Sequence, residues 1–405
     1  MNPYDKTLAK KTLPFTLVLL CAGVIVSIAM GIRHGFGFWQ IPITQAHGWT
    51  RETFVFALAI QNLMWGACQP FAGALADKFG AVRVVIAGAV LYALGLAGMA
   101  VATTGTGFAA TAGFLIGMAQ AGTTFGVVIG VVSRMVTPEK RSWAMGIVSA
   151  AGSIGQFVMM PIDNWMIDGL GWSNALFGLA FIAMLMIPFA FGLRENREQI
   201  AGTQSVGAAI KESFSTPSFL WLMAGYFVCG FQVVFIGVNL PAYLREANLP
   251  AHVGVTALML IGLFNVFGTY YAGVLGGKVQ KKWLLSGIYF GRAVLTTAFI
   301  VLPLTEWSVY VFASGMGLLW LSTVPLTSGV IGTVFGVQYM SMLSGVVFFS
   351  HQIGSFVGLW AGGILYDKTG SYFYMWVAVV VMGVFAGLAN LPILEKPLAR
   401  LKSAI

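Results

Sequence analysis

Residues 73–83 read GALADKFGAVR, a short charged stretch between two apolar runs, at 51–76 and 84–103. Each run has about the length of roughly 20 residues that crosses a hydrocarbon core of about 30 Å as a helix. Glycines at 73 and 80 allow a tight turn between two close helices. The stretch therefore predicts two membrane helices joined by a short polar turn.

The whole chain has the composition of a membrane protein. Of its 405 residues, 58% are hydrophobic and only 9% are charged, and the mean hydropathy is +0.85. Backbone groups in lipid must pair internally, so the long apolar runs are expected to be helices. An all-α protein with twelve transmembrane helices is predicted, at 14–41, 51–76, 84–103, 108–133, 142–166, 173–193, 217–244, 254–277, 284–304, 307–334, 341–366 and 372–394.

Basic residues in the loops predict the orientation in the membrane. An even number of spans puts both termini on one side, and that side carries seventeen Lys and Arg residues against three on the other. Basic loops stay in the cytoplasm, so a multi-pass protein of the cell membrane with both termini cytoplasmic is expected. The net charge of +9 then reflects topology, and nucleic-acid binding is excluded. The seventeen are Lys6, Lys10, Lys11, Lys78, Arg83, Arg134, Lys140, Arg141, Arg194, Arg197, Lys211, Lys278, Lys281, Lys282, Lys396, Arg400 and Lys402; the three are Arg51, Arg245 and Lys368.

Several classes of protein do not fit the sequence. Cys21, Cys68 and Cys229 are scattered without CxxC spacing, which indicates packing rather than redox or metal chemistry. The four histidines are dispersed, so no metal site, no cofactor and no enzyme activity are expected. The sequence contains no glycine-lysine phosphate loop, which argues against transport driven by ATP within this chain.

An internal repeat divides the chain. Residues 73–78 match 273–278 at an offset of 200, and 154–158 match 353–357 at an offset of 199. We infer an N-terminal six-helix half at 1–193, a cytoplasmic linker at 194–216 and a C-terminal six-helix half at 217–405. Paired halves of this kind are typical of secondary transporters that bind substrate between them near mid-membrane. Four-residue glycine spacings allow close helix contacts where halves slide, or in static packing, at Gly146, Gly152, Gly155, Gly354, Gly358 and Gly362.

The stretch at 73–83 matches the pattern G-x-L-x-D-x-x-G-x-x-R, and here the chain resembles the major facilitator superfamily over essentially its whole length. The resemblance implies the twelve-helix fold in two pseudo-symmetric halves. It also implies that Gly73, Asp77 and Arg83 form a conformational latch, in which Asp77 caps the helix that begins near Ser341. A carboxylate is favoured at a helix N-terminus. A solvated turn with ordinary topological charge explains the same residues and stays open.

Within the superfamily the chain is most similar to the bacterial monocarboxylate porter and oxalate/formate group, through phrases at 31–37, 69–73 and 363–370. That similarity implies small carboxylates, moved with a proton or by exchange, and a basic residue in span 8 or 11. The chain departs from the pattern, because span 8 offers Asn265, Thr269, Tyr270 and Tyr271 without a charge. Span 11 carries His351 where the group has a lysine.

Four cationic or titratable side chains lie inside apolar spans: Arg33, His34, Arg292 and His351. Intramembrane charges normally face protein or a wet pathway, so an excess of cations predicts a cavity for an anion. Arg33 is interpreted as a substrate or gate contact, with snorkelling to the interface as the alternative. Arg292 is interpreted as snorkelling or as a structural hydrogen-bond donor. His351 is the expected proton carrier and His34 the reserve.

Uncharged polar residues complete the predicted lining. Gln232 occupies the repeat position of Arg33 and is expected to meet it across the central axis; Asp163 is expected to pair with Arg33 as a structural or gate partner. Trp39, Trp65, Trp165 and Trp320 are either interfacial belt residues or walls of the cavity. The predicted substrate-binding set is Arg33, Gln61, Asn62, Gln120, Gln232, Asn265, Tyr270, His351 and Gln352.

These observations predict a secondary transporter that moves a small organic anion, such as a carboxylate, by alternating access. Proton-coupled symport or anion exchange would drive it, and a monomer without cofactor is expected. A drug/proton antiporter is the alternative, although an acidic cavity would suit cationic drugs better. A transporter-like sensor that binds without turnover also stays open.

Overall fold

The computed structural model describes residues 14–49, 51–195 and 204–402, and every regular element in these ranges is a helix. The π-helical segment is η2 and the 3-10 segment is η3. The elements are α1 (Phe15–His47), α2 (Arg51–Phe79), α3 (Ala81–Val101), α4 (Gly105–Phe108), η2 (Ala109–Leu115), α5 (Ile116–Thr123), α6 (Phe125–Arg134), α7 (Pro138–Leu170), α8 (Trp172–Met184), α9 (Met186–Ala190), η3 (Phe191–Leu193), α10 (Val206–Phe214), α11 (Pro217–Glu246), α12 (Ala251–Gly276), α13 (Lys281–Val301), α14 (Glu306–Leu319), α15 (Thr323–Val334), α16 (Met340–Thr369), α17 (Phe373–Asn390) and α18 (Ala399–Lys402).

Twelve helical units have membrane-spanning length, so the predicted fold class is confirmed. Eleven of them, within the described residues, are apolar enough to cross a membrane by hydropathy. The twelfth is α2, which is 29 residues long but carries three amide side chains in its middle, Gln61, Asn62 and Gln69. These amides lower its hydropathy because they serve contacts inside the protein.

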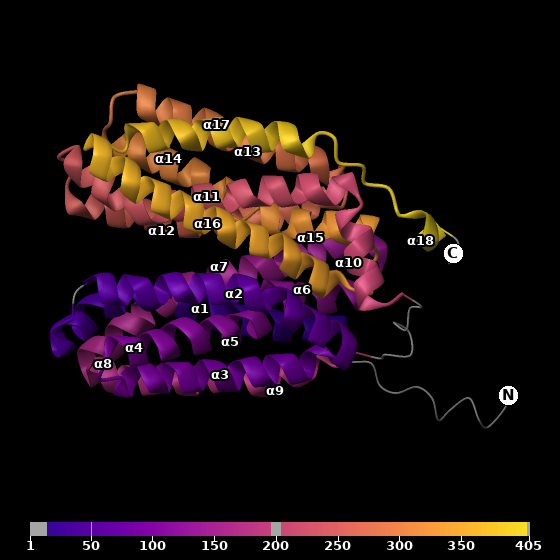
Figure 1. Ribbon diagram of the computed structural model, residues 1–405, viewed down its shortest axis with the longest axis horizontal. Coiled ribbons are helices and arrows are strands. Elements are labelled where there is room, and N and C mark those ends of the chain that lie inside the picture. The colour runs from indigo at the N-terminus through magenta and orange to yellow at the C-terminus, as the bar shows by residue number, and fades with distance from the viewer. Residues whose placement is uncertain (1–13, 50, 196–203, 403–405) are drawn as a thin grey trace.

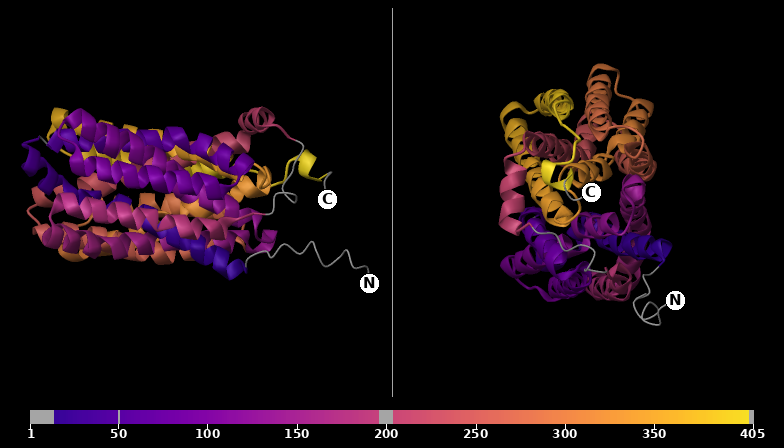
Figure 2. Two further views of the ribbon diagram at one scale, coloured as in Figure 1. Left: turned by 90° about the horizontal axis from the view of Figure 1, so that it is seen from below. Right: turned by 90° about the vertical axis from the view of Figure 1, so that its right-hand side faces the viewer.

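The helices form two bundles that lie against each other along their length (Figure 1). One contains α1 to α9 and the other α11 to α17. The short helices α10 and α18 lie at one end of the molecule, together with the first turn of α1 (Figure 2). We call this the α10 end. The predicted linker at 194–216 contains α10, whereas residues 196–203, Lys6, Lys10, Lys11 and Arg197 lie outside the described residues.

Glycines bring the two bundles into backbone contact at several places, among them α2 with α16 at Gly73 and Gly345, and α7 with α12. A Cβ on Gly146 of α7 would lie only 2.7 Å from the Cα atom of Gly273 in α12. A larger residue at either position would force these helices apart, and this close approach is the kind that small residues permit. The predicted face with Gly354 and Gly358 packs instead on α11, within its own bundle.

Three of the twelve units are interrupted, which the sequence analysis did not predict: one is Trp172–Leu193, at Leu185, and the other two are related by the repeat. The unit at Gly105–Arg134 breaks at Thr124, between α5 and α6, where the backbone is extended. The unit at Glu306–Val334 breaks between α14 and α15, which begins at Thr323. Thr124 and Thr323 are related by the repeat offset of 199 residues. The break is therefore a feature of both halves.

Candidate functional site

Arg33 lies on α1 with its charge uncompensated. One Nη atom donates to Oδ1 of Asn62 at 2.5 Å, and Cζ lies 5.3 Å from the ring centre of Trp65, both on α2. Among the described side chains no carboxylate lies within ion-pair distance of the guanidinium. A half-buried cation held only by an amide and an aromatic face can accept an anion directly.

The opposite bundle reaches this position through α16. Nε2 of Gln352 donates to the carbonyl oxygen of Asn62 at 3.0 Å, and Oε1 of Gln352 lies 3.2 Å from Nδ1 of His351. His351 is 8% exposed and packs against the rings of Tyr226 and Phe348. The structure thus brings together four of the predicted residues: Arg33, Asn62, His351 and Gln352.

A small cavity of about 30 Å³ lies between the two bundles beside this group. Trp65, Gln69 and Thr124 line it from one bundle, and Tyr226 and Phe348 line it from the other. The rings of Trp65 and Phe348 lie 4.7 Å apart. Trp65 is therefore a wall of the cavity rather than a residue of the interfacial belt.

Neutral side chains stabilise the break in the first bundle. Nε2 of Gln69 donates to the carbonyl of Ala121 at 2.9 Å, and Thr124 Oγ1 donates to the carbonyl of Gln120 at 2.7 Å. Nε1 of Trp65 donates to both Gln69 and Thr124. The carbonyl groups freed at the end of α5 are thereby satisfied, as buried backbone groups must be.

A charged side chain stabilises the break in the second bundle. Arg292, which is 1% exposed, donates to the carbonyls of Leu319 (2.7 Å) and Trp320 at the end of α14 and to Oε1 of Gln232 (3.1 Å). The C-terminus of a helix favours a cation. Of the two interpretations of Arg292, the structural hydrogen-bond donor fits this geometry, whereas snorkelling is wrong because the side chain points into the bundle.

Gln232 does not meet Arg33, and that expectation is wrong. Besides accepting from Arg292, its amide donates to the carbonyl of Val379 on α17 at 2.9 Å. Both of its functional groups are therefore used inside the second bundle. The repeat offset correctly equates the two positions, but the two side chains point to different surroundings.

Four further members of the predicted lining lie elsewhere. Gln61 and Gln120 are buried inside the first bundle, where Gln61 donates to the carbonyl of Ala112 and Gln120 donates to Gln61 and Tyr92. Asn265 bridges the bundles, donating to Ser153 Oγ at 2.8 Å and accepting from the Leu321 N–H. Tyr270 is 39% exposed on α12 and packs against Tyr271. None of these four reaches the Arg33 group.

Asp163 does not pair with Arg33, contrary to expectation. It is 0% exposed on α7, and neither carboxyl oxygen has a hydrogen-bond partner among the described residues. It packs against Gly35 on α1, two residues beyond Arg33. The carboxyl group is too enclosed by the α1–α7 contact to reach the guanidinium.

His34 makes its hydrogen bond within its own helix. Its Nδ1 lies 2.7 Å from the carbonyl oxygen of Met30, one turn earlier on α1. A carbonyl only accepts, so Nδ1 carries the proton in the neutral ring. His34 is thus held to its own helix, as the angle of about 100° between neighbouring side chains suggests.

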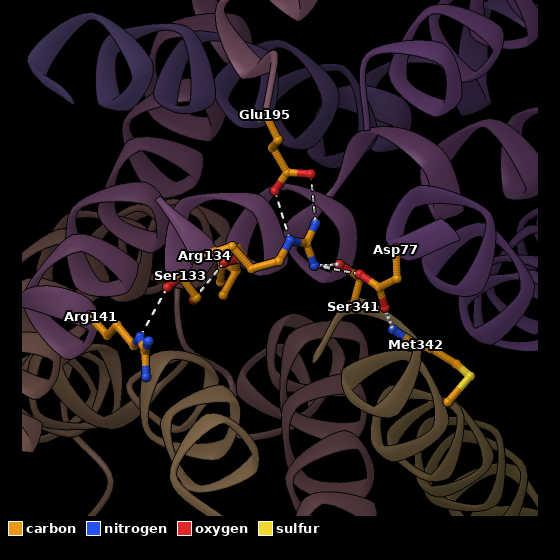
Figure 3. A network of polar contacts seen from close by, with 8 residues as sticks. Asp77, Ser133, Arg134, Arg141, Glu195, Ser341 and Met342 are labelled. Carbon is orange, nitrogen blue, oxygen red and sulfur yellow. Dashed lines mark hydrogen bonds and ion pairs between the residues drawn. The ribbon is translucent and has the colours of Figure 1, made fainter. Parts of the chain in front are cut away.

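At the α10 end, a charged cluster joins the bundles (Figure 3). Oδ2 of Asp77 accepts from the N–H of Met342 at 2.8 Å, in the first turn of α16, and Oδ1 pairs with Arg134 at 2.5 Å. Arg134 also pairs with Glu195 at 2.7 Å. Asp77 thus lies at the helix that the resemblance implies, and Gly73 lets α2 approach Ser341 closely.

Arg134 and Glu195 were missed as members of this cluster. Both are at least 57 residues from their partners along the chain, and Arg134 was interpreted only as a topological charge. Arg83, which the resemblance places in the latch, is exposed at the start of α3 and has no contact with the cluster. No spacing in the sequence connects Asp77 with the end of α6.

Comparisons with known proteins agree with this architecture. The sequence profile of the Major Facilitator Superfamily matches residues 19–359. The uncharacterized MFS-type transporter YcxA of Bacillus subtilis is 24% identical over 95% of this chain and 96% of its own. Monocarboxylate transporter 13 of Rattus norvegicus is 24% identical over 91% of this chain and 86% of its own.

The fold itself is similar to that of a solved structure. The proton:xylose symporter XylE bound to 6-bromo-6-deoxy-D-glucose superposes with a TM-score of 0.74 at 14% identity, covering 96% of this chain and 98% of the symporter. Twelve helical units, two bundles and the match over most of the sequence lead to one conclusion: the chain is a multi-pass membrane transporter of the Major Facilitator Superfamily.

Proposed function

We propose that this transporter moves a small organic anion, a carboxylate, by alternating access, with Arg33 as the residue that binds the negative charge. The observation that carries the proposal is the Arg33 guanidinium itself, which has an amide and an aromatic partner but no acidic one among the described side chains. A relative named as a monocarboxylate transporter supports the same substrate class.

The site also suits a substrate that changes the contact between the bundles. Gln352 links α16 to α2 at Asn62, and Asn62 is the residue that holds Arg33. An anion that engages the guanidinium competes with the Asn62 carboxamide, in the same residue whose backbone carbonyl accepts from Gln352 of the other bundle. Ligand binding can shift a conformational equilibrium only through such differential contacts.

The remaining features of the cycle are part of the same proposal. The protein functions as a monomer in the cell membrane, with the α10 end in the cytoplasm, and the Asp77 cluster latches that end shut. His351 takes up the coupled proton and His34 is the second candidate. Tyr226, Cys229 and, through Cys229, Arg292 are the titratable or charged groups near His351.

Binding and transport by purified protein test the proposal. Formate, acetate, lactate and oxalate are screened for thermal stabilisation, since a ligand that binds only the folded state raises its stability. The best of them is then used in counterflow into proteoliposomes. Arg33→Gln should lose both signals, and Arg33→Lys need not restore them, because an ammonium does not reproduce a bidentate guanidinium contact.

Arg245→Gln is the matched control, since Arg245 is exposed at the end of α11 and the charge change is the same. It should retain both signals. Unchanged affinity in Arg33→Gln, or no response of wild type to any carboxylate, would reject the proposal. Binding without counterflow would identify a sensor instead.

A further inference from the structure

The cavity between the broken helices faces two helix N-termini. Phe125 and Gly126, the first residues of α6, line it from one bundle, and Val324, in the first turn of α15, lines it from the other. The first N–H groups of an α-helix lack partners within the helix and carry the positive end of its dipole. Both half-helices therefore direct positive potential into the same small space.

The negative ends at the two breaks are already satisfied by the protein. Gln69 donates to the end of α5, and Arg292 donates to the end of α14. The N–H of Val324 at the start of α15 already donates to the carbonyl of Leu321 at 2.9 Å, so the positive end that remains open toward the cavity is that of α6. This asymmetry favours an anion as occupant.

Two buried hydroxyl groups in the cavity also lack partners. Thr327 and Ser328 of α15 are 4% and 7% exposed, line the cavity, and make no hydrogen bond with any described residue. Ser344 of α16, also in the lining, has a buried Oγ without a partner. The hydroxyls of Thr327 and Ser328 line the cavity, so an acceptor that enters it, water or a ligand group, can hydrogen-bond to them.

The size of the cavity limits what that acceptor can be. A volume of about 30 Å³ holds roughly two water molecules, and no acidic side chain lines it. A carboxylate group fits, but a whole organic anion does not. Trp65 connects the cavity with Arg33, because its ring lines the cavity and also contacts the guanidinium.

We propose that this cavity is a second subsite, which receives the carboxylate group after it leaves Arg33, between the N-termini of α6 and α15 and the hydroxyls of Thr327 and Ser328. The pair Trp65–Phe348 separates the two subsites and must move apart for the transfer. The inference rests on the proposed function, since it assumes a carboxylate substrate bound first by Arg33.

The test separates binding from translocation. The double variant Thr327→Val/Ser328→Ala removes both hydroxyls with little change in volume. The carboxylate that best stabilises wild type among formate, acetate, lactate and oxalate serves as the probe. We expect counterflow to fall at least tenfold, while the half-saturating concentration for thermal stabilisation changes less than threefold, because Arg33 still binds the anion.

Controls keep this result separate from the proposed function. Thr297→Val removes an exposed hydroxyl on α13 and should leave counterflow unchanged. The single variants Thr327→Val and Ser328→Ala repeat the measurement if the double variant does not fold. Counterflow at the wild-type rate in the hydroxyl variants would overturn the second subsite but not the proposed role of Arg33. Loss of binding in Arg33→Gln alone would sustain the proposed function.

Two further outcomes also overturn the second subsite. One is a wild type that binds the probe without translocating it. The other is counterflow that stops when chloride is replaced by methanesulfonate, which would assign the cavity to a resident chloride ion.

Discussion

The breaks at Thr124 and Thr323 occupy equivalent positions in the repeat, yet the two bundles stabilise them with different chemistry. In the first bundle Gln69, Trp65 and Thr124 supply neutral donors. In the second, the guanidinium of Arg292 donates to the end of α14. Each bundle has one arginine in the middle of an apolar span, Arg33 or Arg292, but only Arg292 donates to the carbonyls of a helix break. The comparison teaches that the partners of a buried charge, not its depth, decide whether it is available to a substrate.

The largest effect on stability is expected from removing Arg292, whose guanidinium donates to the end of α14. Arg292→Gln leaves buried carbonyls at Leu319 and Trp320 without donors, and the unfolding free energy should fall by about 3 kcal/mol or more, as when one partner of a buried charged network is lost. Thermal unfolding monitored by size-exclusion chromatography measures it. Arg33→Gln should cost less than about 1 kcal/mol. Equal losses of unfolding free energy in the two variants would show that the fold depends on Arg33 as much as on Arg292.

Removing a neutral donor at the first break should lower the unfolding free energy less. Gln69→Leu leaves the carbonyl of Ala121 unsatisfied, and the unfolding free energy should fall by about 2 kcal/mol, the typical cost of one buried polar group without a partner. The same thermal assay applies. Gln45→Leu, at an exposed position on α1, is the control and should change stability little. A loss as large as that of Arg292→Gln would show that charge is not what distinguishes the breaks.

Asp77 gives another comparison of the two bundles. It corresponds to Gly277 in the repeat, so only the first bundle has an acidic side chain at this position. Asp77→Asn removes a charge from the start of α16, which is worth up to about 2 kcal/mol in partly buried geometry. We expect greater access from the α10 end, measured by cysteine labelling there. Asp168→Asn, exposed near the end of α7, should leave labelling unchanged. Identical labelling in both variants would support the solvated-turn interpretation.

A change of pH should have the smallest effect, on anion affinity, and only the second bundle should cause it. The first break contains no titratable side chain, whereas His351 lies beside Cys229, a contact of Arg292. A protonated His351 would add positive charge at the site, so anion affinity should be higher in acid than in alkaline buffer, by tenfold or less. The measurement is the half-saturating carboxylate concentration between pH 5 and 8.

The same residue can be tested for coupling. An inward proton gradient should drive carboxylate uptake into proteoliposomes, and His351→Gln should abolish that drive while sparing counterflow, which needs no net proton movement. Gradient-driven uptake that survives in His351→Gln would move the proton to His34 or to the substrate.

The helices were predictable because length and hydropathy act locally. Even α2, which fails the hydropathy criterion, was predicted at 51–76 and is observed at Arg51–Phe79. The group of Arg33, Asn62, His351 and Gln352 follows from the rule that polar side chains avoid lipid. The sequence did not show which polar residues face the space between the bundles. Gln232 and Gln61, for example, make their hydrogen bonds within their own bundles.

The breaks and the ion pairs depend on contacts between distant segments. Thr124 has no neighbouring proline that would have predicted an interruption. Its side chain accepts from Trp65 and donates to Gln69, both on α2. Asp163 was expected to pair with Arg33, but its carboxyl group packs against Gly35 in the contact between α1 and α7. Side-chain direction within a packed bundle is set by all neighbours together, and a single sequence does not contain that information.

The short helices after each break have a mechanical consequence. α6 has 10 residues and α15 has 12, so each is a rod of roughly 15–18 Å that starts at the cavity. A tilt of about 15° about the break would displace the far tip of such a rod by roughly 4–5 Å, given that length. Arg134 sits on the tip of α6, within the ion-pair cluster. A tilt of α6 would therefore have to break the ion pairs of Arg134 with Asp77 and Glu195.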